Sequence, residues 1–294
     1  MTSLRGDDIS FGILYNKCMN AQPFFSVIIP TFTRRPFLEI AVDSVLEQNF
    51  KDFELIIVDD GSMDGTKELI SKYNDERIIY TYQENRGVAS ARNRGVGLSE
   101  GKFIAFLDSD DKWVPEKLEV TSDYIKKFSD INIFHTEEAW YRNGKLLAQK
   151  EKHKKPTGWV YKNALPLCCI SISTAVINKK VFDEIGAFDE VLTACEDYDF
   201  WLRATNRYEV KLIPECLTIK DGGRPDQLSS CVWGLDRFRI MSLEKMLSSG
   251  DLSKENYADT LSEFRKKCKI FAAGAENKGR VATASFYISL PEKY

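Results

Sequence analysis

Three carboxylates stand within four positions at the end of an apolar stretch, in the sequence FLDSDD at residues 106–111. Acidic side chains this close repel one another unless a cation or a proton lies between them. If strand geometry continues through the motif, Asp108 and Asp110 point to the same face, because side chains alternate along a strand. Such a pair suits a hard divalent ion that also holds a diphosphate. A solvated acidic turn is the alternative that these residues alone leave open.

A second acidic cluster is VDDGSMDGT at residues 58–66. Asp60, Ser62 and Asp64 fit the first, third and fifth positions of a calcium-binding loop. Its twelfth position needs a bidentate Glu but holds Ser71, so we exclude calcium binding of that kind. Two interpretations remain, namely helix capping by Ser62 or Asp64, and a hydrogen bond from one aspartate to a base edge or a ribose.

Two further segments place charged residues at the start of a predicted helix. NRGVASARNR at 85–94 carries three arginines, which suit an anion or form a solvated helix face. CEDYDFW at 195–201 sets Glu196 and Asp197 beside aromatic residues. That pair suits a base next to a sugar contact, or it is an acidic helix start favoured by the dipole.

The elements that position these clusters alternate regularly along the first half of the chain. Apolar, β-branched runs predict strands at 25–29, 53–58, 77–82 and 102–107, and helical spacing predicts helices at 36–48, 64–73, 88–99 and 115–128. Alternation of this kind predicts a parallel, doubly wound sheet covered by helices. Ligands of such sheets bind at the carboxyl ends of the strands, where the polar clusters fall.

The pattern loosens after residue 130. We expect strands at 131–140, 145–149, 172–177 and 208–219, with a turn at Asn143-Gly144, and helices ending near Gly186, at 196–205, from 226 onward and at 256–274. The chain therefore divides into an N-terminal extension (1–23), an α/β domain (24–225) and a C-terminal helical region (226–294).

Composition limits the functions that remain. Hydrophobic residues make up 43% of the chain, which is typical of a globular protein, and 41 Lys and Arg against 44 Asp and Glu argue against a nucleic-acid binder. Two histidines exclude a His-rich zinc site, so carboxylates would hold any metal. Seven irregularly spaced cysteines indicate reduced thiols. No stretch resembles a membrane span or a secretion signal, so we expect a cytoplasmic protein.

Six motifs stand in the order and approximate spacing of family 2 glycosyltransferases with the GT-A fold, which the chain resembles over about residues 24–205. They are SVIIPTF, ELIIVDDGS, NRG, ARN, FLDSDD and the Glu-Asp pair at 196–197. The resemblance implies a Rossmann-like α/β fold, with a mixed, mainly parallel sheet, helices on both faces and a C-terminal helical appendage.

The resemblance also implies a nucleotide-sugar site at the first four strand ends. Its expected nucleotide-binding residues are Thr31, Phe32, Asp60, Arg86, Gly87, Arg92 and Asp108. Thr31 and Phe32 would line the base pocket and Asp60 would meet the nucleobase. Asp108 and Asp110 would bind Mn²⁺ or Mg²⁺, which neutralises the departing diphosphate.

On the acceptor side the resemblance assigns Asp197 as the general base of a single, inverting displacement. Glu196 would hold the donor sugar or the acceptor, with Trp201 as an aromatic contact. The chain departs from the family in two places. Phe32 stands where relatives have Tyr, and no histidine follows the last core strand, so Asp221 or water would complete the metal site.

The expected reaction is metal-dependent transfer from a nucleotide sugar, with a UDP-sugar favoured, to a glycan or lipid-linked acceptor in cell-surface polysaccharide assembly. This implies the inner face of the membrane and a peripheral membrane contact. The basic stretch 145–155 is then either a solvated loop or a patch for acidic lipid. A sugar nucleotidyltransferase and a non-catalytic glycan-binding scaffold are the alternatives; the first usually has a glycine-rich loop after strand one, and residues 31–36 contain no glycine.

Overall fold

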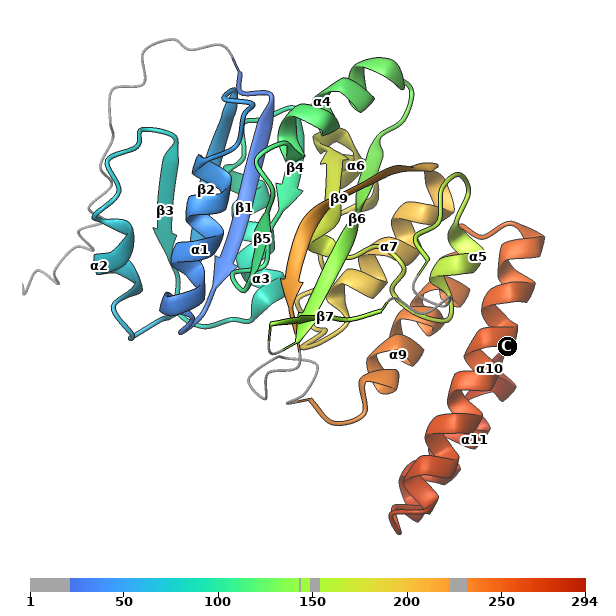
Figure 1. The fold of residues 1–294 in the computed structure, drawn as a ribbon. Coiled ribbons are helices and arrows are strands. Elements are labelled where there is room, and N and C mark those ends of the chain that lie inside the picture. The colour runs from blue at the N-terminus through green and yellow to red at the C-terminus, as the bar shows by residue number, and fades with distance from the viewer. Residues whose placement is uncertain (1–21, 143, 149–153, 223–231) are drawn as a thin grey trace, which may run out of the picture.

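The computed structural model describes residues 22–142, 144–148, 154–222 and 232–294 (Figure 1). Its strands are β1 (Phe25–Thr31), β2 (Phe53–Asp59), β3 (Ile78–Tyr82), β4 (Phe103–Phe106), β5 (Asp111–Trp113), β6 (Ile133–Arg142), β7 (Lys145–Leu146), β8 (Ala175–Asn178) and β9 (Val210–Asp221). Within the described chain they form one sheet in the order β3-β2-β1-β4-β8-β6-β9-β5, with β7 paired to β6.

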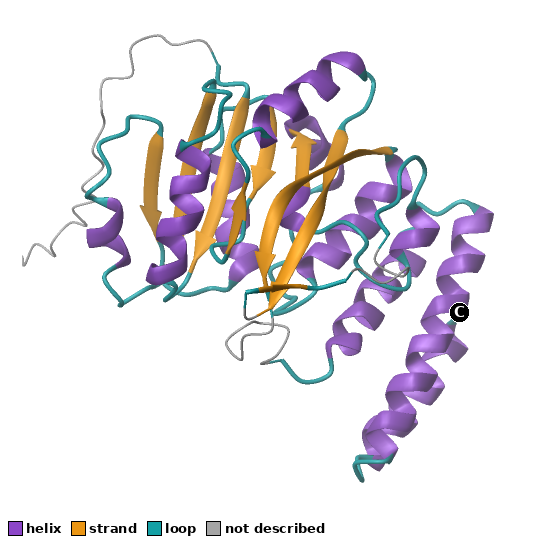
Figure 2. Cartoon of the chain, in the orientation of Figure 1, coloured by secondary structure: helices purple, strands orange, loops and turns teal. Residues whose placement is uncertain are grey.

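Helices connect and cover these strands (Figure 2). They are α1 (Arg35–Leu46), α2 (Thr66–Ile70), α3 (Val88–Leu98), α4 (Lys117–Lys127), α5 (Tyr161–Ala164), α6 (Lys179–Ile185), α7 (Glu196–Arg207), α9 (Leu235–Ser248), α10 (Lys254–Glu276) and α11 (Val281–Ser289). Two short 3₁₀ helices are η2 (Ile172–Thr174) and η3 (Leu290–Lys293).

The first half of the sheet is parallel, as the alternating pattern predicts. β1 lies between β2 and β4 and pairs in parallel with both, and β2 pairs in parallel with β3. The carboxyl ends of these four strands therefore lie at one edge of the sheet. This arrangement brings segments that are far apart in the sequence to the same place.

Both faces of the sheet are buried here because most side chains of β1 and β2 are apolar. Val27 and Ile29 pack in one core with α1 and α4. Ile28 and Ile56 point to the opposite face and pack in a second core with α3, α6 and α7. Helices consequently cover each face of the sheet (Figure 1). The expectation of a mixed, mainly parallel sheet between two helical layers is confirmed.

The second half of the sheet departs from a purely parallel arrangement. β8 is antiparallel to β4 and β6, and β5 is antiparallel to β9. The strand β5 was not predicted, because it has three residues and its amino end is the acidic motif itself. The predicted strand at 172–177 is also half wrong, since residues 172–174 form η2.

The C-terminal helices share a third core with α7 and α5. Its buried members include Tyr161 from α5, Tyr198 and Leu202 from α7, Leu243 from α9 and Phe264 from α10. The helical appendage is thus packed onto the helix that begins with Glu196. It ends with α11 and η3, which lie in the predicted helical region although no separate helix was expected there. Most of the expected N-terminal extension, and the expected boundary at 225–226, lie outside the described residues.

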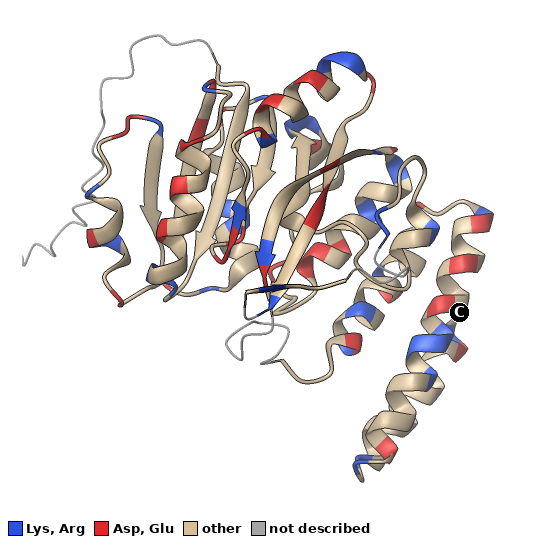
Figure 3. Cartoon of the chain, in the orientation of Figure 1, with Lys and Arg blue, Asp and Glu red and all other residues tan. Residues whose placement is uncertain are grey.

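Acidic and basic residues are spread over all layers of the fold (Figure 3). No helix in the described part of the chain combines the length and hydropathy needed to cross a bilayer.

A buried polar network lies behind η2, against β6. Lys117 is fully buried, and its Nζ donates to Thr174 O at 2.6 Å and to Thr136 Oγ1 at 3.2 Å. His135 is also fully buried, with Nε2 2.8 Å from Pro156 O, so the neutral ring donates this hydrogen bond. Burial and the neighbouring lysines, Lys155 foremost, lower the pKa of His135 to about 3.

We predict that His135 makes the protein less stable as the pH falls from 7 to 5. The unfolded chain binds a proton near pH 6.5 while folded His135 stays neutral down to about pH 3, so acidification favours unfolding. The cost between pH 7 and 5 is about 2 kcal/mol. Urea unfolding of the wild type should show this loss, and His135→Gln, which keeps a donor but does not titrate, should lack it. Equal pH dependence in both proteins would show that His135 does not cause the loss of stability.

Candidate active site

The acidic motif forms a closed turn between β4 and β5. Asp111 N donates to Asp108 O at 3.0 Å, which closes the turn. Ser173 of η2 holds it from the side, since its Oγ accepts from Asp108 N at 3.1 Å and donates to Asp111 Oδ2 at 2.6 Å. The turn is therefore fixed by a segment that lies more than sixty positions further along the chain.

Each acid of the turn pairs with a cation from a different part of the chain. The pairs are Asp108 with Arg92 at 2.8 Å, Asp110 with Arg34 at 2.9 Å, and Asp111 with Lys220 at 2.7 Å. The mutual repulsion of the acids is thus balanced by Arg34 before α1, Arg92 on α3 and Lys220 near the end of β9. The predicted cluster of acids is real, and it is surrounded by fixed positive charge.

These pairs shift the pKa values of the groups involved. Burial opposes ionisation of Asp108, but Arg92 and Lys220 hold its pKa below the ordinary value. Burial raises the pKa of Asp111 to about 7, with Asp108 and Asp110 adding to the shift and Lys220 opposing it. Burial alone would lower the pKa of Lys220, but Asp111 and Asp108 outweigh it and raise that pKa.

Arg92 joins the acidic turn to the start of α7. It is 4% exposed; its Nη2 donates to Asp108 Oδ1 and its Nη1 to Glu196 Oε1. Asp108 and Glu196 therefore lie on either side of one guanidinium group. Burial would lower the pKa of Arg92, but Asp108, Glu196 and Asp197 together raise it, so Asp197 is also near. The structure brings the two acidic motifs together, as the sequence predicts.

Asp197 is the more exposed acid of the Glu-Asp pair. α7 begins at Glu196, and acids in its first turn are favoured by the helix dipole. Asp197 Oδ1 accepts from Tyr198 N at 2.7 Å, and Oδ2 accepts from Cys168 Sγ at 3.4 Å. Burial raises the pKa of Cys168, so its thiol stays protonated and acts as the donor. Sequence reasoning missed this contact, because no spacing links Cys168 to α7.

Asp60, expected to meet the nucleobase, organises the loop before α3. Its carboxylate accepts hydrogen bonds from Gln83 Nε2 at 2.8 Å, Arg86 N at 2.9 Å and Gly87 N at 2.8 Å. It is 4% exposed, and its own N donates to Thr31 O. Contact with a base stays a prediction. The loop that would carry such a contact is held in shape by this carboxylate.

The other predicted nucleotide residues differ in exposure. Thr31 is buried at the end of β1, and its Oγ1 has no hydrogen-bond partner among the described residues. Phe32, the next residue, is 49% exposed at the same strand end. Gly87 has a φ of 89°, which only glycine adopts readily, at the entry to α3. Arg86 points outward and pairs with Glu190 at 3.1 Å.

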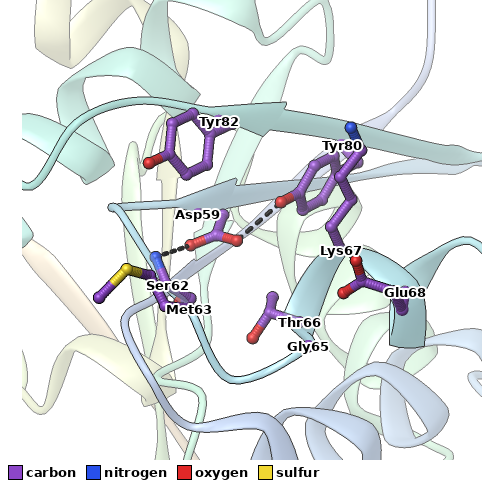
Figure 4. Close-up of a pocket in the computed structure, with 9 residues that line it drawn as sticks. All are labelled: Asp59, Ser62, Met63, Gly65, Thr66, Lys67, Glu68, Tyr80 and Tyr82. Carbon is purple, nitrogen blue, oxygen red and sulfur yellow. Dashed lines mark hydrogen bonds between the residues drawn. The ribbon is translucent and has the colours of Figure 1, made fainter.

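A pocket beside β2 and β3 adds residues that the sequence analysis did not select (Figure 4). It is lined by Asp59, Ser62, Met63, Gly65, Thr66, Lys67, Glu68, Tyr80 and Tyr82. Asp59 accepts from Ser62 N at 2.8 Å and from Tyr80 Oη at 2.7 Å. Tyr80 and Tyr82 stand two positions apart on β3, which was the available signal that they share a face.

The expected sugar contact of Trp201 is wrong. Trp201 is fully buried and packs in the core beneath the sheet, with its ring 5.1 Å from that of Phe200. It lies one helical turn after Asp197, and over that turn α7 passes from the edge of the sheet to its covered face. Arg92, expected to bind the nucleotide, is enclosed between Asp108 and Glu196. In this structure it therefore positions those two acids.

The described residues of this turn would hold a divalent metal only with substrate oxygens or water completing its coordination. No group of three or more His, Cys, Asp or Glu side chains suited to a metal occurs among the described residues. Asp108 and Asp110 would supply oxygen ligands, and Asp221 is exposed at the end of β9. Mg²⁺ is commonly held by one or two carboxylates plus substrate phosphates and water, and these two acids match that pattern. Residues 223–231, which follow, lie outside the described residues.

The family model described as Glycosyl transferase family 2 matches residues 26–186, which include nearly all of β1, the acidic turn and η2. The chain belongs to glycosyltransferase family 2. It is 37% identical over 169 residues to the putative teichuronic acid biosynthesis glycosyltransferase TuaG of Bacillus subtilis, covering 56% of this chain and 66% of that protein.

Two other relatives extend this result. One is the Escherichia coli UDP-Glc:alpha-D-GlcNAc-diphosphoundecaprenol beta-1,3-glucosyltransferase WfgD. It is 30% identical over 178 residues, which cover 60% of this chain and 68% of that protein. The chain is 32% identical over 214 residues to an uncharacterized glycosyltransferase of Rickettsia bellii, covering 68% of this chain but only 30% of that protein. The chain thus carries a family 2 glycosyltransferase domain, and it spans only part of the length of several of these relatives.

The fold agrees with solved glycosyltransferase structures. Staphylococcus aureus TarS, residues 1–349 in complex with UDP-GlcNAc, superposes with a TM-score of 0.66 at 17% identity and covers 92% of both chains. At this identity the likeness concerns the fold. The superposition covers 92% of the chain, whereas the family model ends at residue 186. The likeness in fold therefore extends across the C-terminal helices.

We predict that Arg92→Met strongly destabilises this glycosyltransferase. Removing the guanidinium leaves the buried Glu196 and the partly exposed Asp108 without their shared partner, which costs about 3–5 kcal/mol. Arg86→Met is the matched control, because its pair with Glu190 is exposed and should contribute below about 1 kcal/mol. Urea unfolding of both variants measures the difference, and equal losses would show that Arg92 is no bridge.

Proposed function

We propose that the protein transfers a sugar from a nucleotide-diphosphate donor to a hydroxyl acceptor with inversion at the anomeric carbon. The observation that supports this most directly is Arg92, whose guanidinium binds Asp108 of the turn and Glu196 beside Asp197. One site thus contains acids suited to a diphosphate and its cation, and a separate acid suited to an acceptor hydroxyl. A single displacement needs these two functions on opposite sides of one sugar.

In this mechanism Asp197 accepts the proton of the acceptor hydroxyl. The acceptor oxygen forms a bond to the anomeric carbon while the bond from that carbon to the diphosphate oxygen breaks, and the electron pair leaves with the diphosphate. An aspartate is normally ionised at neutral pH and is available as a base. The hydrogen bonds from Cys168 and from Tyr198 N orient the Asp197 carboxylate. Glu196, held by Arg92, faces the donor sugar or the acceptor.

Asp108 and Asp110 would hold Mn²⁺ or Mg²⁺, which when bound supplies Lewis-acid neutralisation of the diphosphate. The protein itself places Arg34 against Asp110, so this arginine adds positive charge beside the acids that would hold the cation and the diphosphate. Arg92 keeps Asp108 in place throughout, because it is enclosed between two carboxylates.

The names of the relatives support a setting in cell-surface polysaccharide synthesis. TuaG is named for teichuronic acid and WfgD for a UDP-glucose donor with a diphosphoundecaprenol-linked acceptor. We therefore propose a UDP-sugar donor and a glycan or lipid-linked acceptor, met at the inner face of the membrane. The basic stretch 145–155 contributes less to such a contact than its composition implies. Lys155 is buried and pairs with Glu138 at 3.1 Å, and residues 149–153 lie outside the described part.

We predict that a nucleoside diphosphate stabilises the protein. A ligand present at about 100 times its Kd adds about 2.7 kcal/mol to the stability of the folded state. Thermal unfolding with UDP, GDP and dTDP, each with and without Mn²⁺, should show a rise in Tm for one base and not for the others. If no nucleotide raises Tm, the site does not bind a donor and the scaffold alternative holds.

We predict that Asp197→Asn lowers kcat by about 10²–10⁴-fold, because general-base catalysis has this magnitude. The amide keeps the shape of the side chain but does not accept the proton. Asp123→Asn, an exposed position on α4, is the control and should leave kcat unchanged. Product formation with the donor identified by thermal unfolding gives the measurement. Unchanged turnover in Asp197→Asn would remove this residue from the mechanism.

A further inference from the structure

Lys220 brings a fixed positive charge to the acidic turn from the end of β9. It is the cross-strand neighbour of Asp111 in the β5–β9 pair, and its Nζ lies 2.7 Å from Asp111 Oδ2. Nζ also donates to Ser171 Oγ at 3.2 Å and lies 5.3 Å from the centre of the Trp140 ring. The side chain is only 13% exposed. The ammonium is therefore held in place by the backbone register and by its neighbours.

One N–H of this ammonium has no hydrogen-bond acceptor among the described residues, and Asp108 is the next carboxylate to it. An ammonium has three N–H groups. Among the described residues, Asp111 and Ser171 accept two of them, while Asp108 Oδ2 lies 4.0 Å from Nζ, beyond hydrogen-bond range. The side chain of Asp108 is 29% exposed, so this part of the turn is open to a ligand. A phosphate oxygen bound next to Asp108 would meet the remaining N–H.

We propose that Lys220 is a donor-binding residue whose ammonium contacts the diphosphate of the nucleotide sugar. This inference rests on the proposed function and names a residue of the same site. The diphosphate gains negative charge as its bond to the anomeric carbon breaks. A cation already fixed beside it stabilises that charge without reorganisation. Lys220 has this property because the pairing of β9 with β5 sets its position.

The competing explanation is that Lys220 only neutralises buried Asp111. The two roles differ in what happens when both charges of the pair are removed. A purely neutralising lysine becomes unnecessary once residue 111 is uncharged, because the turn then holds no buried charge that lacks a partner. If Lys220 contacts the diphosphate, its removal weakens nucleotide binding even when residue 111 is uncharged.

The test therefore compares Asp111→Asn with the double variant Asp111→Asn/Lys220→Met. The amide introduced at position 111 keeps an acceptor for Ser173 Oγ, and the double variant removes the pair together, which protects the fold. Circular dichroism melting confirms that each variant is folded. Titration calorimetry with UDP, GDP and dTDP in the presence of Mn²⁺ measures Kd.

We expect the double variant to bind the preferred nucleoside diphosphate about tenfold more weakly than Asp111→Asn, the size of one lost charge-assisted hydrogen bond. Equal Kd values in the two variants would overturn the inference and leave the proposed function standing. A wild type that binds none of the three nucleotides would overturn the proposed function, and this inference with it.

Discussion

The compensation of crowded carboxylates by cations from distant parts of the chain is the constraint on which this site depends. Asp108, Asp110 and Asp111 stand together at the end of β4 and repel one another, so the chain must supply positive charge from elsewhere. It does so with Arg34, Arg92 and Lys220, which no short-range interaction would bring together. The fold is the means by which these cations reach one turn.

Strand order explains how distant residues meet there. β1 and β4 are neighbours, so Arg34, just after β1, lies beside the turn that follows β4. β5 turns back against β9, and this antiparallel pairing places Lys220 opposite Asp111. η2 then supplies Ser173, which binds the turn at both ends. A purely parallel sheet would bring Arg34 to the turn, but it would not bring Lys220 or Ser173 there.

The sequence predicts the parallel half of the fold because that half depends on local pattern. The apolar runs at β1 and β2 are long enough to be recognised, and their polar ends coincide with a sheet edge. β5 and η2 could not be predicted, since three residues have no periodicity of their own. The bridge of Arg92 to Glu196 was missed for a related reason. The residues are 104 positions apart, and only their shared burial reveals that they are partners.

Trp201 and Cys168 show the same limit on the scale of single side chains. Residue type favours Trp201 as a sugar contact, but the depth of α7 beneath the sheet decides its role, and depth is a property of packing. Cys168 carries no signal in the sequence, yet its thiol reaches the carboxylate of Asp197. In each case the residue type permits several roles and the tertiary contact selects one.

The position of α7 is fixed from both of its sides, which explains why the C-terminal helices matter to the site. Arg92 binds Glu196 at the start of the helix. Three positions later Asp199, 2% exposed, pairs with Lys245 of α9 at 2.7 Å and with Arg203 of α7 at 3.0 Å. Without α9, the buried Asp199 would keep Arg203 as its only paired cation among the described residues, so the docking of α9 helps to hold α7 in place. Asp197 lies between these two anchors. Its distance from the acidic turn is therefore set jointly by the α/β sheet and by the helices that follow it.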